Sequence, residues 1–326
     1  MSIQKKLLIT IAIAAALYLG ACVWMGWGNI LQAFAQFQWQ WLPVCLALAF
    51  GNYVIRFTKW HYYLHLIDVP LPRLLSFQIF LSGMVMSATP GKFGEVFKSY
   101  LVKSVNGAPL SKTAPIILAE RLTDFIAFFL MALLGVSLLP NGEWVFGASV
   151  AAIALVLAIV SWRSLMEAIL DRLATIQKLE SIVEKLRVAY ESAYRLIAPG
   201  PLLWATLISI VSWWLECLAF YLVLVGFGEQ IPLLSATFIY AFATIVGALL
   251  MTPGGIGPTE GAMGGLLIML FDTPTGAAAS ATFLIRVCTL WFAVTVGLIT
   301  LSLCSNRFAP AVDALEHAGD AATPDK

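Results

Sequence analysis

A short motif interrupts two long apolar stretches of the chain. It reads Thr-Pro-Gly-x-x-Gly and begins at Thr89 and again at Thr252. Proline lacks the amide donor that a helix needs, and glycine tolerates backbone angles that other residues resist, so each copy is predicted to end a helix. Inside a bilayer, the freed backbone groups must be buried in protein or line a watery cavity. The residues expected to form the two turns are Pro90, Gly91, Gly94, Pro253, Gly254, Gly255 and Gly257.

The composition is that of an integral membrane protein. Of the 326 residues, 60% are hydrophobic and only 11% are charged, whereas soluble domains carry about 25% charged residues. The net charge of +1 gives no indication of a nucleic-acid partner. The five cysteines lie in apolar runs without Cys-x-x-Cys or Cys/His spacing, and there is no nucleotide-binding loop. We therefore expect neither a metal site nor a cofactor.

The apolar stretches predict an all-α membrane protein with six spans. A spanning helix needs about 20 apolar residues, whereas the two stretches that contain the motif leave shorter arms on each side of it. Such arms favour re-entrant hairpins, although two full crossings by each hairpin would leave the termini on the same side. The predicted spans are 7–27, 41–59, 113–139, 143–162, 202–226 and 276–304, and the hairpins are 74–105 and 233–271.

The distribution of lysine and arginine predicts the orientation, because these residues accumulate on the cytoplasmic side. With both termini in the cytoplasm of a bacterial cell, four loops face out, and none of them contains lysine or arginine. Those loops are 28–40, 140–142, 227–231 and 272–275, and the cytoplasmic side collects Lys5, Lys6, Lys59, Arg73, Lys98, Lys103, Lys112, Arg163, Arg172, Lys178, Lys185, Arg187, Arg195 and Arg307. The expected location is the inner membrane.

This topology makes two segments, 41–139 and 202–304, inverted repeats of each other. Each contains a span, a hairpin and a span, and an arginine follows the first motif residue by 32 residues in one and by 34 in the other. Inverted repeats with broken helices are a transporter architecture. Between them, 163–199 has the periodicity of a cytoplasmic amphipathic helix. We expect one membrane domain, 1–308, and a disordered tail, 309–326.

Ionisable groups at membrane depth are costly and mark candidate functional sites. Glu120 and Asp124 share a helix face with Arg121 between them. Two acids around one arginine leave a negative charge, for which Lys92 and Arg286 are the candidate cations. The isolated Arg56 is expected to snorkel to the interface.

Two interpretations of the charged residues remain open. They form either a buried ion-pair network that fixes helix register, or a polar cavity that presents arginine and free amides to an anionic head group. In the second case the carboxylates balance charge or carry protons. The candidate substrate-binding residues are Lys92, Glu95, Glu120, Arg121, Asp124, Glu216, Glu260 and Arg286. His61 and His65, beside several aromatic residues, favour an interfacial belt over a metal site.

Four ordered motifs resemble one known family. They are Pro90-Gly91-Lys92-x-Gly94-Glu95, Glu120-Arg121-x-x-Asp124, Pro253-Gly254-Gly255-x-Gly257-x-x-Glu260, and an arginine in the last span. The chain is similar to the membrane region of lysylphosphatidylglycerol synthases and to stand-alone, flippase-like relatives. The resemblance implies movement of lipid between leaflets by the matching residues. Fewer than 20 residues follow Arg307, so we expect no aminoacyl-transferase domain, and lysyl transfer is not implied.

The sequence therefore predicts a lipid transporter, not an enzyme. The expected partner is a membrane phospholipid or another anionic or zwitterionic lipid, and envelope-biosynthesis enzymes are possible partners. A polyprenyl-phosphate flippase, an intramembrane transferase acting on a lipid-linked substrate, and a scaffold without transport activity remain alternatives.

Overall fold

The computed structural model describes residues 33–88, 93–138, 162–174, 180–304 and 307–308, with a few isolated positions between 144 and 158. Several predictions lie outside these residues. They are the span 7–27, most of the span 143–162, the tail 309–326, and Pro90, Gly91 and Lys92 of the first motif.

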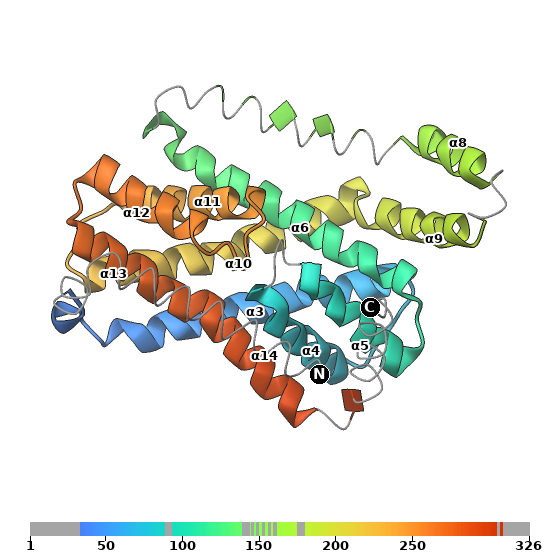
Figure 1. Cartoon of the computed structure of the whole chain (residues 1–326), viewed down its shortest axis with the longest axis horizontal. Helices are drawn as coiled ribbons and strands as arrows, with labels where there is room; N and C mark the ends of the chain where they lie inside the picture. The colour runs from blue at the N-terminus through green and yellow to red at the C-terminus, as the bar shows by residue number, and fades with distance from the viewer. Residues whose placement is uncertain are drawn as a thin grey trace, which may run out of the picture.

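Every regular element in the described part of the chain is a helix (Figure 1). The α-helices are α3 (Trp41–Leu66), α4 (Arg73–Gly83), α5 (Phe97–Asn106), α6 (Leu110–Ala132), α8 (Arg163–Ala174), α9 (Glu180–Leu196), α10 (Pro199–Gly226), α11 (Leu233–Leu249), α12 (Pro258–Phe271), α13 (Thr275–Arg286) and α14 (Phe292–Leu303). The shorter helices are η1 (Met84–Ala88), η2 (Phe93–Val96), η3 (Leu133–Leu138) and the π-helical turn η5 (Val287–Trp291). The all-α prediction is confirmed.

Three described helices are long and apolar enough to cross a membrane. They are Trp41–Leu66, Pro199–Gly226 and Thr275–Leu303, the last of which joins α13, η5 and α14. Helix α6 has 23 residues but carries three charged residues near its middle. Helices α11 and α12, with 17 and 14 residues, are shorter. Among the described residues, three of the six predicted spans thus correspond to helices of spanning length, and the re-entrant hairpins remain a prediction.

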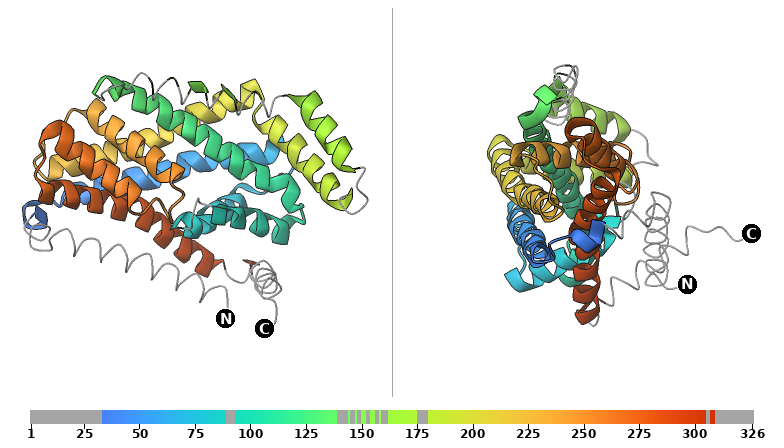
Figure 2. Two further views of the ribbon diagram at one scale, coloured as in Figure 1. Left: turned by 45° about the horizontal axis from the view of Figure 1, so that its top comes forward. Right: turned by 90° about the vertical axis from the view of Figure 1, so that its left-hand side faces the viewer.

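The helices form two apolar cores, and α3, α6 and α10 contribute to both. One core joins these helices to α4, α5, α14 and the end of α9, and the other joins them to α11, α12 and α13. Helices α8 and α9 lie at the opposite end of the molecule from the connection between α12 and α13 (Figures 1 and 2). Several polar side chains of α3 and α6 are buried between these cores, namely Asn52, Arg56, Lys59, Thr113, Glu120, Thr123 and Asp124.

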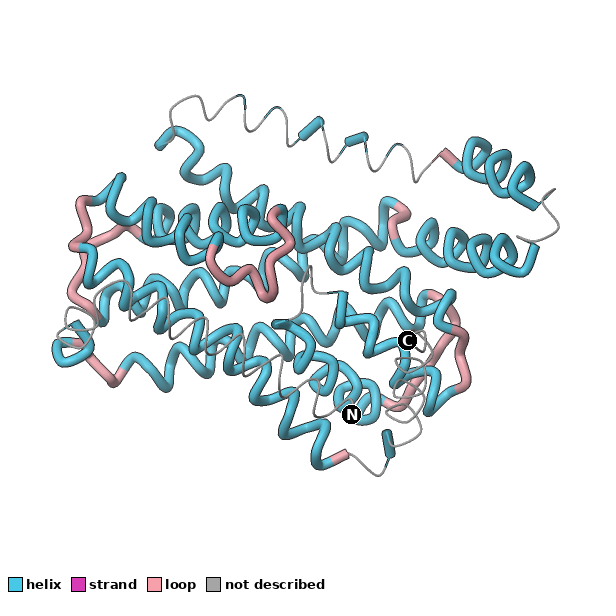
Figure 3. Tube along the Cα trace, viewed as in Figure 1, coloured by secondary structure: helices cyan, strands magenta, loops and turns pink. Residues whose placement is uncertain are grey.

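The second motif ends a helix, as predicted. Helix α11 stops at Leu249 and α12 begins at Pro258, and the connection appears as a central loop in Figure 3. Three glycines of this loop have positive φ, at 60°, 73° and 92° for Gly254, Gly255 and Gly257. Residues with a Cβ avoid this conformation, which is why the glycines are needed at these positions.

The two interrupted stretches touch each other. A Cβ added to Gly254 would lie 3.3 Å from the Cα of Ala88, the last residue of η1 before the first motif. On α14, a Cβ added to Gly297 would lie 2.4 Å from the backbone nitrogen of Val85. The end of the first helix arm is therefore held between the second turn and α14.

Three sequence interpretations were wrong. Lys59, assigned to the cytoplasmic surface, lies within α3 with none of its surface exposed, because α3 continues to Leu66 rather than ending at 59. Lys98, assigned to the same surface, is 2% exposed. Arg56 does not snorkel, since it is 8% exposed and its guanidinium lies 4.8 Å from the ring centre of Trp213.

Candidate functional site

Each interrupted stretch supplies a glutamate to an arginine that lies 26 residues later. In the first half, Arg121 of α6 lies 3.1 Å from Oε2 of Glu95 in η2. In the second half, Nε of Arg286 at the end of α13 lies 2.6 Å from Oε1 of Glu260 in α12. The equal separation means that both halves connect a hairpin to the following helix in the same way.

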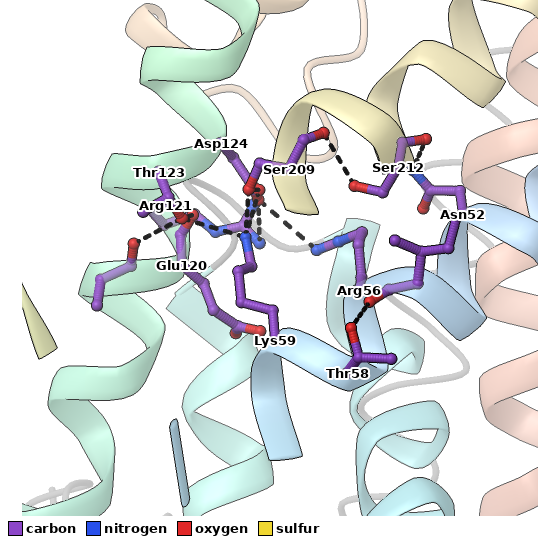
Figure 4. A network of polar contacts seen from close by, with 12 residues as sticks. Asn52, Arg56, Thr58, Lys59, Glu120, Arg121, Thr123, Asp124, Ser209 and Ser212 are labelled. Carbon is purple, nitrogen blue, oxygen red and sulfur yellow. Dashed lines mark hydrogen bonds and ion pairs between the residues drawn. The ribbon is translucent and has the colours of Figure 1, made fainter. Parts of the chain in front are cut away.

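Asp124 lies at the centre of a buried charged cluster in the first half, which also contains Arg56, Lys59 and Arg121 and is called the first cluster (Figure 4). Its carboxylate is 2.7 Å from Nζ of Lys59, 3.2 Å from Arg121 and 3.9 Å from Arg56. Lys59 also donates to the hydroxyl groups of Thr123, at 3.1 Å, and Ser209, at 2.7 Å. All three protons of this ammonium group thus have acceptors, and they connect α3, α6 and α10.

Glu120 is paired with a second buried lysine. Nζ of Lys98 lies 2.6 Å from Oε2 of Glu120 and 3.8 Å from Oε2 of Glu95. The same ammonium group lies 4.5 Å from the ring centre of Trp60, a distance at which cation–π attraction is effective. Its aliphatic stem passes over Gly83, where an added Cβ would approach Cγ of Lys98 to 2.2 Å.

These contacts correct the predicted charge balance. The cations that answer Asp124 and Glu120 are Lys59 and Lys98, whereas Arg286, one of the two proposed, pairs with Glu260. The sequence did contain a pattern that could have identified Lys59 as a buried cation. Three polar residues at steps of four and three positions, Asn52, Arg56 and Lys59, lie on one face of an apolar helix, and all three are buried.

In the second half, Arg286 and Glu260 form a second cluster, in which Arg286 also binds the turn between α11 and α12. It donates a hydrogen bond to the backbone carbonyl of Gly254 as well as to Glu260. The other carboxylate oxygen of Glu260 accepts from the amide of Gly257, at 2.6 Å, at the start of α12. The π-helical turn η5 follows Arg286 directly, and such turns occur often at functional sites.

Glu216 is a further buried carboxylate of the second half. This α10 residue is 4% exposed and accepts a hydrogen bond of 2.5 Å from the hydroxyl group of Tyr240 on α11. It therefore links α10 to the first arm of the second hairpin. Among the described residues, no group of three His, Cys, Asp or Glu residues is placed to hold a metal ion.

One cavity brings the two halves together. It has a volume of about 360 Å³, and Arg121, Asp124 and Arg286 all lie on its wall. The second turn contributes Met251, Thr252, Gly254 and Gly255, and the remaining wall is formed by Leu122, Phe125, Phe128, Thr244, Ile245, Gly247, Ala248 and Thr259. Glu95 and Glu260 lie directly behind the arginines as their ion-pair partners, and Glu120 lies further in.

The comparisons with known proteins identify the family of this chain. Residues 8–297 match the family model described as "Lysylphosphatidylglycerol synthase TM region". The chain belongs to this family. Two similar curated proteins are "UPF0104 membrane proteins" of Methanothermobacter thermautotrophicus strain Delta H.

The matched region makes up most of each relative. One protein is 26% identical over 308 residues, which cover 88% of this chain and 90% of the relative. The other is 22% identical over 308 residues, which cover 85% and 89%. In those relatives, the family's membrane region is nearly the whole protein.

Proposed function

We propose that this family member moves a lipid with an anionic or zwitterionic head group between the leaflets of the inner membrane. The observation that carries the proposal is the cavity whose wall includes Arg121 and Arg286 from the two halves. A volume of about 360 Å³ is at the small end of ligand sites. This size suits a head group better than a complete lipid, so the tails would remain in the bilayer.

The cavity wall has the chemistry of an amphipathic ligand. Its apolar residues can contact the part of the lipid next to the head group. Nε of Arg121 and the hydroxyl group of Thr252 are buried without a hydrogen-bond partner among the described residues. Guanidinium groups bind phosphate oxygens strongly. A phosphate group that entered the cavity would therefore meet both charge and available donors.

The proposed arrangement in the membrane follows from the two hairpins. Their equal glutamate–arginine spacing and the contact between Gly254 and Ala88 support two re-entrant hairpins in inverted repeats, with six full spans around them. Both termini would lie in the cytoplasm. Rocking one repeat against the other would expose the cavity first to one leaflet and then to the other.

The proposal assigns the protein a transport role and no covalent chemistry. Movement would be downhill or coupled to protons carried by the buried carboxylates. Phospholipids and polyprenyl phosphates share the phosphate group that the cavity would bind, so both are candidate substrates. The experiment must therefore include both lipids.

The test is lipid movement in liposomes that contain the purified protein. Fluorescent phosphatidylglycerol or a labelled polyprenyl phosphate is placed in both leaflets, and a reagent that cannot cross the bilayer quenches the outer leaflet. We expect wild-type protein to make the inner-leaflet pool accessible and Arg121→Ala to abolish this effect. Arg163→Ala, which removes an exposed surface pair, serves as the control and keeps the activity. A wild-type protein that moves neither lipid overturns the proposal.

A further inference from the structure

Arg121 and Arg286, the two arginines on the cavity wall, differ in whether their acidic partners have other cations nearby. Arg121 pairs with Glu95 at 3.1 Å and with Asp124 at 3.2 Å. Each of these acids has a second cation nearby, because Lys98 lies 3.8 Å from Glu95 and Lys59 lies 2.7 Å from Asp124. Lys98 is shared with Glu120, and Arg56 also lies 3.9 Å from Asp124. Lys59, Lys98 and Arg56 therefore balance the charges of Glu95, Glu120 and Asp124 when Arg121 leaves.

Arg286 has no such freedom. Within the described residues, no other cation lies within 4.0 Å of its partner Glu260. The side chain of Glu260 is only 13% exposed, and removing the partner of a buried charge is strongly destabilising. Arg286 also donates to the carbonyl of Gly254, so its departure would release the turn as well.

The exposed fractions of the side chains also distinguish Arg121 from the two lysines. The side chain of Arg121 is 25% exposed, and it lies on the cavity wall. The side chains of Lys59 and Lys98 are 0% and 3% exposed, and neither residue lines the cavity. A ligand in the cavity thus reaches Arg121, while the two lysines remain behind it against the carboxylates.

We propose that Arg121 exchanges its carboxylate partners for the phosphate of the lipid, while Lys98 and Lys59 retain Glu95 and Asp124. The proposal rests on the proposed transport function and deepens it. The ligand must carry an anionic group with oxygens for one guanidinium, as a lipid phosphate monoester or diester does. Lys59, Lys98 and Arg286 are positioning residues, and Arg121 is the residue that contacts the lipid.

Thermal unfolding of purified variants tests the division between the arginines. Arg286→Gln is expected to lower Tm by about 5–10 °C because Glu260 is left buried and unpaired. The double variant Arg286→Gln/Glu260→Gln recovers most of this loss. Arg121→Gln lowers Tm by less than half as much as Arg286→Gln. Equal losses for the two single variants, or a larger loss for Arg121→Gln, overturn the proposal.

The affinity for lipid is a second measurement. If the pair of Glu95 and Arg121 were purely structural, replacing Glu95 would not tighten lipid binding. Glu95 competes with the lipid phosphate for Arg121, so Glu95→Gln is expected to tighten binding of short-chain phosphatidylglycerol by roughly 3- to 10-fold. Arg121→Gln abolishes the binding, and the double variant Glu95→Gln/Arg121→Gln also fails to bind the lipid. Short-chain polyprenyl phosphate is titrated in parallel, and a gain with either lipid identifies the source of the phosphate.

The outcomes separate this inference from the transport proposal. If wild-type protein moves lipid but Glu95→Gln weakens the binding or leaves it unchanged for both lipids, the exchange is wrong and the transport function stands. If wild-type protein moves neither lipid in liposomes, the transport function is wrong, and the exchange falls with it.

Discussion

Gly254 lies against Ala88, although the two residues are 166 positions apart in the chain. A Cβ on Gly254 would lie 3.3 Å from the Cα of Ala88 and 3.0 Å from Cδ2 of Leu290. Each of the two interrupted stretches therefore limits the space available to the other. Gly254 itself also lies on the cavity wall.

Gly254→Ala should reduce both stability and lipid movement. The φ angle of +60° costs a residue with a Cβ about 1–2 kcal/mol, and the new methyl group would press on the backbone of Ala88. Gly261→Ala is the matched control, since it lies in α12 with nothing within 4 Å of the added Cβ. We expect a gain of about 0.4–1 kcal/mol for the control. Equal Tm values for the two variants would contradict the contact.

Gly83→Ala should disturb the buried lysine beside it. The added Cβ would lie 2.2 Å from Cγ of Lys98, so the lysine stem must move away from Glu120. We expect a lower Tm and a loss of lipid movement. Gly265→Ala provides the control because its added Cβ meets nothing within 4 Å. Full activity in Gly83→Ala would show that the position of Lys98 does not matter for transport.

Lys98→Met should be among the most destabilising single changes. Glu120 has no exposed surface, and Lys98 is the cation paired with it in the described structure. Removing one partner of a buried ion pair costs about 3–5 kcal/mol. The double variant Lys98→Met/Glu120→Gln should recover much of that loss, as measured by thermal unfolding. A double variant less stable than Lys98→Met would mean that the pair is not the source of the effect.

The ion pair between Asp68 and Arg195 should tie the end of α9 to the loop after α3 in a pH-dependent way. Oδ2 of Asp68 lies 2.8 Å from Arg195, and this hydrogen bond is the main cause that lowers the pKa of Asp68. Because the pKa is lower in the folded state, the contribution of the pair is complete above the ordinary carboxylate pKa. It is lost as the pH falls through the lowered pKa.

Hydrogen exchange of the backbone amides of α9 measures how far the ion pair between Asp68 and Arg195 stabilises the end of this helix. Near pH 7, Asp68→Asn should exchange faster than wild-type protein, because the variant lacks the charged partner of Arg195. At a pH below the lowered pKa, the two proteins should exchange alike. A difference that persists at low pH would show that Asp68 acts through something other than its charge.

The sequence was sufficient for features that depend on local chemistry. Proline and glycine in the second motif predict the break between α11 and α12, and the structure has it at 250–257. Glu260 and Arg286, both named from the sequence as candidate binding residues, lie 2.6 Å apart. Helix ends and contacts between neighbouring elements follow from short-range rules that hold in most surroundings.

Arg121, three residues before Asp124 on the same helix, does pair with it as the sequence predicts, but the lysine partners of Asp124 and Glu120 could not be obtained in that way. The rule that lysines face the cytoplasm describes loops, whereas Lys59 and Lys98 lie inside helices that turn them toward carboxylates on α6. Which helices adjoin α6 is a tertiary property. The cavity likewise required the packing of α6 against α11, because its wall combines Phe125 of the first half with Thr244 of the second.

The π-helical turn at Val287–Trp291 has a consequence for the last helix. An extra residue in one turn rotates everything beyond it by about 100° relative to an uninterrupted α-helix. This rotation points Gly297, rather than one of its bulkier neighbours, at the backbone of Val85. If Val287–Trp291 were wound as an ordinary α-helical turn with no residue removed, that glycine would be turned aside and a branched or longer side chain would face η1, so the two segments would be forced apart.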